Sequence, residues 1–169
     1  MRETDVGAEV GTDMDLHFVH AKYAVGSGFD GDGDGQDDPW YNQPFDCFWF
    51  NKHPNWGTFD PTANDDPSLA LDDTDGAGPE VVLLAVPQNG AKYLIGAHYW
   101  SDHGLGETRA RVRVFIYGAP VHTAEHDLGL RDFWCVVSVD WPSATITPCV
   151  DADGEPNVTQ AYQNPYFSP

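Results

Sequence analysis

Aspartates alternate with glycines in the stretch FDGDGDGQDD, which runs from residue 29 to residue 38. Oxygen ligands at the first, third and fifth positions, a glycine at the sixth and a backbone carbonyl at the seventh make up the first half of a calcium loop. The spacing therefore predicts a calcium ion bound by Asp30, Asp32, Asp34, the Gln36 carbonyl and Asp38. The alternative is a solvated acidic loop, because clustered aspartates repel one another and gain nothing by ordering without a cation.

The flanks of this loop differ from those of a helix–loop–helix calcium hand. Tyr41 stands where that hand has its bidentate glutamate, so the last ligand must come from Asp37, Asp38 or elsewhere. No amphipathic helix pattern lies on either side. We therefore expect the loop on a β scaffold, and it resembles the helix-free aspartate loops of thrombospondin type 3 repeats and related bacterial adhesin linkers.

A second acidic stretch, LDDTDGAGPE, combines several carboxylates with a tight Asp-Gly and Gly-Pro turn. Carboxylate and carbonyl oxygens suit hard cations. We expect a second calcium site here, and its ligands would be Asp72, Asp73, Asp75 and Glu80. Asp13 and Asp15 could complete this site or stand alone, and the alternative is a simple turn capped by an aspartate. A third cluster, DADGE at residues 151–155, is short and close to the C-terminus, and a bound metal is the less favoured interpretation there.

Histidines offer a different metal chemistry. The predicted strand alternation puts His17 and His98 on polar faces, where they could meet Cys47 and bind zinc or copper. Their spacing matches no compact zinc motif, so surface or inter-strand histidines are the favoured interpretation. The chain also lacks the G-x-S-x-G and H-E-x-x-H motifs, and we expect no catalytic activity.

Two of the three cysteines can be paired by strand geometry. Residues 132–141 and 144–150 read as strands joined by a tight turn at 141–143. Placing Asp140 opposite Ala144 sets Cys135 opposite Cys149, and directly opposed Cβ atoms lie roughly 4.5–5.5 Å apart, close to what a disulfide needs. Such a bridge implies an oxidising compartment. Cys47 is then a buried thiol or pairs outside this domain.

The elements that must position these groups are strands. Period-two alternation or short apolar runs predict strands over residues 13–20, 45–50, 81–86, 92–100, 108–117, 120–128, 132–141 and 144–150. In the first, Met14, Leu16 and Phe18 are expected to face the core. Residues 92–100 and 108–117 are expected to form one long hairpin. No segment shows helical periodicity, so the fold class is all-β, an antiparallel β-sandwich or jelly roll of about eight strands with long calcium-bound loops at 21–44 and 51–80.

Composition limits the partners. With 169 residues, the chain is long enough for a single domain over 1–169, with an N-terminal extension at 1–12 and an irregular tail at 151–169. Eight basic and 27 acidic residues give a formal charge of −19, which excludes nucleic acid and anionic membranes as expected partners. No apolar run reaches the length of a membrane span, and the first ten residues lack the order of a signal peptide.

The order DMDLHFVH, DDTDGAGPE, KYLIGAHYWSDHG and TRARVRVFIYG resembles two groups of bacterial domains. One is the pre-peptidase C-terminal type of β-sandwich domain of secreted proteases, and the other is a set of uncharacterised domains in large surface proteins. The resemblance covers residues 13–118 and implies a calcium-stabilised jelly roll with an accessory role. The inserted aspartate loop and the C-terminal hairpin depart from the simpler members.

Three functions follow as expectations. The first is a non-catalytic calcium-binding extracellular domain that serves adhesion or assembly of a bacterial surface protein, with self-association through an edge strand as an option. The second is a carbohydrate-binding module whose stacking platform would include Trp40, Trp56 and Trp100, with Trp49 as a further candidate. The third is an enzyme with a histidine and cysteine metal centre.

Overall fold

The computed structural model describes residues 11–21, 29–58, 60, 62–74, 76 and 79–166. Within this part of the chain there is no helix, and every strand pairing is antiparallel, so the all-β class is confirmed. The expected N-terminal extension lies largely outside the described residues. The strands are β1 (Asp13–His20), β2 (Asp46–Cys47), β3 (Pro67–Leu71), β4 (Val81–Leu84), β5 (Lys92–Ser101), β6 (Thr108–Ile116), β7 (Ala119–Leu128), β8 (Phe133–Asp140), β9 (Thr145–Pro148) and β10 (Val158–Thr159).

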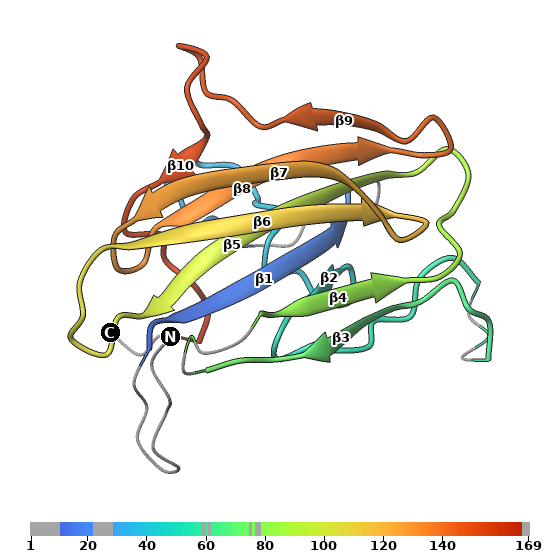
Figure 1. Ribbon diagram of the computed structural model, residues 1–169, viewed down its shortest axis with the longest axis horizontal. Helices are drawn as coiled ribbons and strands as arrows, with labels where there is room; N and C mark the ends of the chain where they lie inside the picture. Colours follow the sequence, from blue (N-terminus) through green and yellow to red (C-terminus); the bar gives the residue numbers. More distant parts are fainter. Residues whose placement is uncertain are drawn as a thin grey trace.

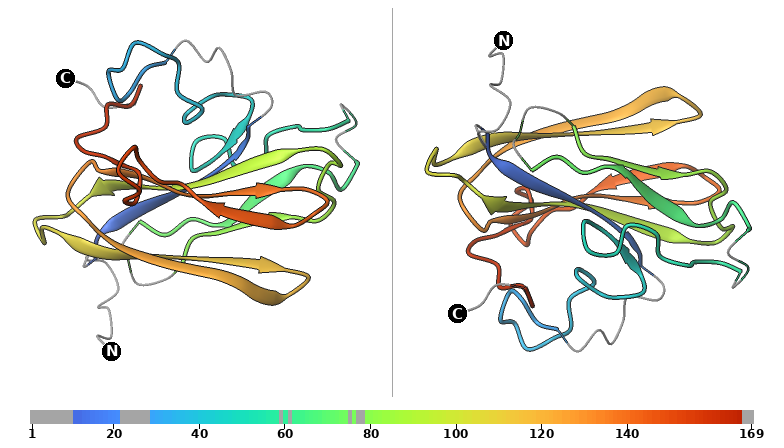
Figure 2. Two further views of the ribbon diagram at one scale, coloured as in Figure 1. Left: turned by 90° about the horizontal axis from the view of Figure 1, so that it is seen from above. Right: turned by 90° about the horizontal axis from the view of Figure 1, so that it is seen from below.

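The strands form one large sheet and two ribbons (Figure 1). The six-stranded sheet has the order β10-β8-β5-β1-β2, and β9 also pairs with β8. The ribbon β6–β7 lies over one face of this sheet (Figure 2). Residues 29–50 and the C-terminal residues 160–166 gather on the opposite face (Figure 2). This arrangement is consistent with a β-sandwich, and the jelly-roll connectivity stays a prediction.

Two cores lie on the two faces of the large sheet. The first, between the sheet and the β6–β7 ribbon, contains Tyr99, Val112, Leu128 and Trp134. The second, under the loops, is largely aromatic, and its buried members are Val19, Trp40, Tyr41, Phe48, Phe133 and Tyr162. The sheet is therefore covered on both faces, which leaves no solvent-facing side for its central strands.

This double covering buries the polar face of β1 more completely than the apolar face that was expected to be the core face. Asp13, Asp15 and His17 are buried, whereas Met14 and its two apolar neighbours on the same face are only half-buried. The alternation in the sequence was correct, and Met14 and Phe18 pack against the first core as expected, but the expectation of a single buried face was wrong. The reason is tertiary, because the aromatic loop residues cover the face that carries the polar side chains.

The expected hairpin between residues 92–100 and 108–117 is not formed. β5 pairs with β1 and β8, and β6 pairs with β7 instead. The connection from Ser101 to Glu107 crosses from the large sheet to the ribbon. A two-residue turn at Tyr117 and Gly118 joins β6 to β7, and both residues have positive φ, 52° and 78°, as a tight primed hairpin turn requires. β7 begins directly after this turn and is ten residues long, whereas a short strand was expected here.

The C-terminal hairpin forms with a register one residue away from the expected one. Asp140 lies opposite Thr145 and not Ala144, because Ala144 belongs to the turn with a φ of 55°. Cys149 follows the end of β9, and the disulfide to Cys135 is present with a Cα–Cα distance of 5.6 Å. Disulfides are typical of proteins outside the reducing cytosol.

Two paired segments were missed in regions expected to be irregular. β3 lies within the long loop at 51–80, and β10 lies in the C-terminal tail. The expected strand at 45–50 shrinks to the two residues of β2. Membrane-crossing helices are absent from the described part of the chain.

Candidate functional site

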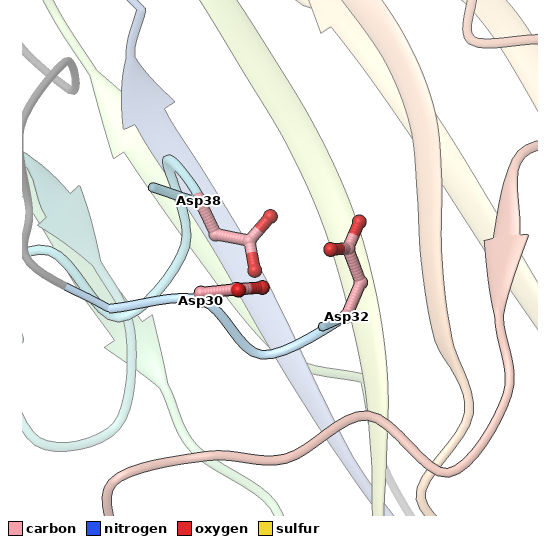
Figure 3. Close-up of side chains that lie close together, drawn as sticks. All are labelled: Asp30, Asp32 and Asp38. Carbon is pink, nitrogen blue, oxygen red and sulfur yellow. The ribbon is translucent and has the colours of Figure 1, made fainter. Parts of the chain in front are cut away.

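Three carboxylates of the aspartate loop lie close together. One carboxylate oxygen each from Asp30, Asp32 and Asp38 lies within 4.8 Å of the other two. Figure 3 shows the Asp30 and Asp38 side chains side by side and the Asp32 carboxylate turned toward them across the loop. This spacing allows one small cation to contact all three carboxylates.

Hydrogen bonds within the loop hold its shape. The Asp30 carboxylate accepts hydrogen bonds from the amides of Gly33 at 2.7 Å and Gly35 at 2.9 Å. Both glycines have positive φ, 78° and 84°, a conformation that side chains disfavour. The glycine spacing in the sequence therefore has a backbone reason that is independent of any ion.

Asp38 fastens the loop to the C-terminal segment. Its Oδ2 atom accepts hydrogen bonds from the Gly31 amide at 2.6 Å and from the Tyr162 hydroxyl at 2.9 Å. The Gln163 amide donates to the Gly31 carbonyl at 2.9 Å. Burial raises the pKa of Asp38, against the lowering effect of its hydrogen bonds with Gly31 and Tyr162. A Cβ atom at Gly31 would overlap the Tyr162 ring, so the close docking requires glycine at this position.

Asp34 and Gln36 are not part of the converging group. The Asp34 carboxylate accepts a hydrogen bond from the Gln36 amide at 2.7 Å, and both residues are exposed. The structure thus brings together three of the four carboxylates expected to bind calcium in this loop. Asp34 belongs to the same loop, but its carboxylate contacts the Gln36 amide and does not join the group.

A cavity of about 250 Å³ lies beside the loop. Asp32 and Asp38 contribute to its wall, together with the rings of Trp40, Phe133 and Tyr162 and the polar residues Asn157 and Thr159. A cation bound between the loop carboxylates would therefore lie beside this cavity.

The second acidic stretch packs against β1. Glu80 accepts a hydrogen bond from the backbone amide of Leu16, and Asp72 forms an ion pair with Lys52 at 2.6 Å. Asp73 is half-buried, and the expected ligand Asp75 lies outside the described residues. The carboxyl groups of this stretch thus lie near the start of β1.

Burial perturbs the acids in this region strongly. It raises the pKa of Asp13 and of Asp15 to about 7, and the pKa of Glu80 to about 9. Neighbouring carboxylates add to the effect: Asp15 raises the pKa of Asp13, and Asp15 and Asp72 raise that of Glu80. These groups hold protons at a pH where ordinary aspartates and glutamates have lost them.

The histidines expected on polar faces are buried. His17 has no exposed surface, its Nδ1 atom lies 2.6 Å from the Asp46 carboxylate, and its ring stacks on Phe48 at 5.2 Å. The Tyr41 hydroxyl lies 2.8 Å from Nδ1 of His98. Burial lowers the pKa of His98 well below its usual range, so this ring is neutral at physiological pH.

Cys47 does not join the two histidines. It lies directly opposite Phe18 in the ladder, so its side chain is on the other face of the sheet from His17. Burial raises the pKa of the Cys47 thiol to about 12, and its sulfur lies 3.5 Å from the Lys52 carbonyl. Among the described residues, the expected zinc or copper triad is not brought together.

The third acidic cluster and the tryptophans expected to bind a sugar do not form the expected sites in the described part of the chain. In the third acidic cluster, the Asp151 carboxylate caps the amides of Asp153 and Glu155 at 2.9 and 3.0 Å, as in a simple turn. Trp40 and Trp56 are 6% and 3% exposed and belong to different cores. Trp100 is half-buried and packs against Trp49 at 5.3 Å. The tryptophans thus do not form one exposed row.

Sequence reasoning missed Asp46 and Tyr162 as members of these polar networks. Asp46 lies in the aromatic stretch FDCFWF, and the only sign of a special role in the sequence was that a charged residue stands between apolar ones. Tyr162 lies in a tail without periodicity, and nothing in its surroundings indicated a contact with a loop more than a hundred residues away. Comparison of the chain with protein-family models, curated proteins and solved structures finds no match.

Proposed function

We propose that this chain is a non-catalytic, calcium-binding β-sandwich domain that acts outside the cell, in adhesion or in the assembly of a bacterial surface protein. The observation that carries the proposal is the approach of the Asp30, Asp32 and Asp38 carboxylates within 4.8 Å of one another. Three carboxylates with a net charge of −3 suit a hard divalent cation, and calcium completes its 6–8 oxygen ligands with carbonyls and water.

The contacts of the loop support a stabilising role for the ion. Asp38 lies between the loop and Tyr162, so an ion on Asp38 would tie residues 29–38 to the C-terminal segment. The disulfide, the resemblance to accessory domains of secreted proteins and the charge of −19 all agree with an extracellular location. Extracellular calcium sites are typically weak, with a Kd on the order of 10⁻⁴ to 10⁻³ M.

The experiment compares two substitutions in one loop. Asp32→Asn removes a carboxylate of the converging group, and Asp34→Asn removes one outside it, with the same change in net charge. Calcium binding is measured by isothermal titration and by terbium luminescence sensitised by the aromatic rings of the neighbouring cavity. We expect Asp32→Asn to weaken binding at least tenfold and Asp34→Asn to change it less than threefold. Equal effects of the two substitutions, or no binding by the unmodified protein at 5 mM calcium (about five times the weakest typical Kd), would refute the proposal.

The cavity favours a second candidate function, that of a carbohydrate-binding module. Its wall combines Asp32 and Asp38 with the polar residues Asn157 and Thr159, and vicinal hydroxyls of a sugar can replace water on a calcium ion. A glycan array probed with calcium and again with chelator tests this candidate. Binding of a defined glycan only in calcium would favour it, and an array without any calcium-dependent signal would reject it.

A further inference from the structure

Strand β6 has one edge that pairs with no other strand of the described part of the chain. It pairs with β7 along its whole length, and the two strands form a separate sheet. Of the backbone hydrogen bonds that the described residues form outside the strand ladders, none involves residues 108–116. In an antiparallel pair, alternate residues direct their N–H and C=O groups away from the partner strand. The free edge of β6 therefore offers a row of backbone groups to which a further strand can pair.

The side chains along this edge form a buried row and an exposed row. Ala110, Val112 and Val114 belong to the first core and are each 8% exposed, whereas the residues between them are exposed arginines. In Figure 1, β6 lies on the side of the ribbon nearer to β1 and β4, and β7 on the side nearer to β9. On β1, Met14 and Leu16 are only half-buried. A strand that fits this edge therefore has apolar residues on its inner face and acidic residues on its outer face.

One arginine of the exposed row lacks a carboxylate partner. Arg109 and Arg111 form ion pairs with the carboxylates that lie opposite them on β7. Arg113 lies opposite Thr123, and it forms no ion pair with any residue that the structure describes. Acidic residues outnumber basic ones by 27 to 8 in this chain, so an arginine without a carboxylate points to an acidic residue on the free side of β6.

The first ten residues of the chain, MRETDVGAEV, have the pattern that this edge requires. They lie outside the described residues. Acidic residues at odd positions alternate with apolar residues at even positions: Glu3, Asp5 and Glu9 against Val6, Ala8 and Val10. This period of two is that of a strand with one apolar face and one charged face.

The chain enters β1 beside the start of β6. The Gly11 carbonyl lies 2.6 Å from Nδ1 of His103, which belongs to the connection between β5 and β6. Only Gly11 and Thr12 separate residue 10 from the first residue of β1. A segment that ends at residue 10 can therefore lie along β6 in the antiparallel direction without a long connection.

We propose that residues 3–10 form a further strand on the free edge of β6 of the same chain. In this antiparallel register Asp5 lies opposite Arg113 and Glu9 lies opposite Arg109, and directly opposed charges of opposite sign stabilise a pair of strands. The apolar residues at positions 6, 8 and 10 then lie on the inner face, beside the buried row of β6. The added strand closes an edge that would otherwise be open to other chains. It is independent of the proposed calcium-binding role.

Neighbouring registers fit less well. A shift of two residues in one direction places Glu9 opposite Glu107, where like charges repel. A shift of two residues in the other direction places Gly7 opposite Arg113 and leaves this arginine without a carboxylate. The proposed register is therefore the one in which the acidic residues of the segment and the arginines of β6 match without a repulsive pair.

Hydrogen exchange, followed amide by amide in the full chain, tests the pairing. In the unmodified protein the β6 amides that point away from β7 should exchange as slowly as those that point toward it. Asp5→Lys puts a second positive charge opposite Arg113 and should speed exchange of the outward amides about tenfold, while the amides of β5 and β8 stay unchanged. Glu3→Lys is the matched control, because it changes the net charge equally but lies opposite the uncharged Phe115; its effect should be less than threefold. Adding Arg113→Asp to Asp5→Lys restores opposite charges and should restore slow exchange.

Three results would overturn the inference. Outward β6 amides that exchange at least tenfold faster than the inward ones in the unmodified protein would mean that the edge is open. Equal effects of Asp5→Lys and Glu3→Lys, or no rescue by Arg113→Asp, would mean that the register is wrong. Sedimentation velocity over a wide range of protein concentration should show a monomer whose β6 amides are protected throughout. Protection that appears only with a dimer would mean that a second copy supplies the strand.

Discussion

Metal-free protein should lose stability as the pH rises from 5 to 7, which is opposite to ordinary acid denaturation. In the folded state the pKa values of Asp13 and Asp15 are about 7, against an ordinary value of 3.8, and the pKa of Glu80 is about 9, against 4.5. The folded state therefore binds more protons than the unfolded state in this interval. The stability that these protons provide is complete below about pH 4 and is lost as the pH passes 7 for the aspartates and 9 for the glutamate.

The size of the effect follows from the number of protons. One extra bound proton changes the free energy of unfolding by about 1.4 kcal/mol per pH unit. We count one net proton for the three groups together, because solvent reaches part of this region and screens it. Over two pH units this gives roughly 2.7 kcal/mol, and a change of that size shifts the melting temperature of a domain of this length by roughly 5–11 °C.

The assay is thermal unfolding followed by circular dichroism at pH 5, 6 and 7, in buffers freed of divalent ions. Glu80→Gln should reduce the pH dependence, since glutamine keeps an oxygen for the Leu16 amide without a titrating group. A melting temperature of metal-free protein that stays constant or rises from pH 5 to 7 would refute the reasoning.

Three further predictions address the packing of the loops. Asp46→Ala leaves buried His17 without its carboxylate and should lower the free energy of unfolding by about 3–5 kcal/mol in urea titrations; a loss below 1 kcal/mol would mean that the pair is not buried as described. Gly31→Ala should displace the loop from Tyr162 and make residues 29–38 sensitive to protease while the large sheet stays folded, and unchanged proteolysis would contradict the close contact. Replacing both cysteines of the disulfide by serine should cost about 3 kcal/mol, the value for closing a loop of about 15 residues, and an unchanged melting temperature would show that the bridge does not restrain the unfolded chain.

Much of the secondary structure was predictable because strand periodicity is local. Residues 13–20 form β1 with the expected bounds, and the segments 92–100, 108–117 and 132–141 each contain a strand close to its expected range. The pairing of these strands was less predictable. Ser101–Glu107 reads as a hairpin loop in isolation, and only the packing of β6–β7 over the large sheet shows that the chain crosses between layers here.

For the candidate site, too, the local features were predictable from the sequence and the long-range contacts were not. The spacing of aspartates and glycines between residues 30 and 38 predicts a cation loop by itself, because ligand order and the positive φ of two glycines are properties of a few consecutive residues. The spacing did not reveal that Asp38 contacts Tyr162, since that contact joins residues 124 positions apart.

What the sequence determined alone is the β class, the acidic loop and the pairing of Cys135 with Cys149, because each depends on the order of near neighbours. What only the tertiary structure decided is that both faces of β1 are covered. Period-two alternation predicts an apolar core face and a polar solvent face, but here aromatic side chains from distant loops cover the polar face as well. That covering removes Asp13, Asp15 and His17 from water, and burial raises the pKa of Asp13 and of Asp15 to about 7.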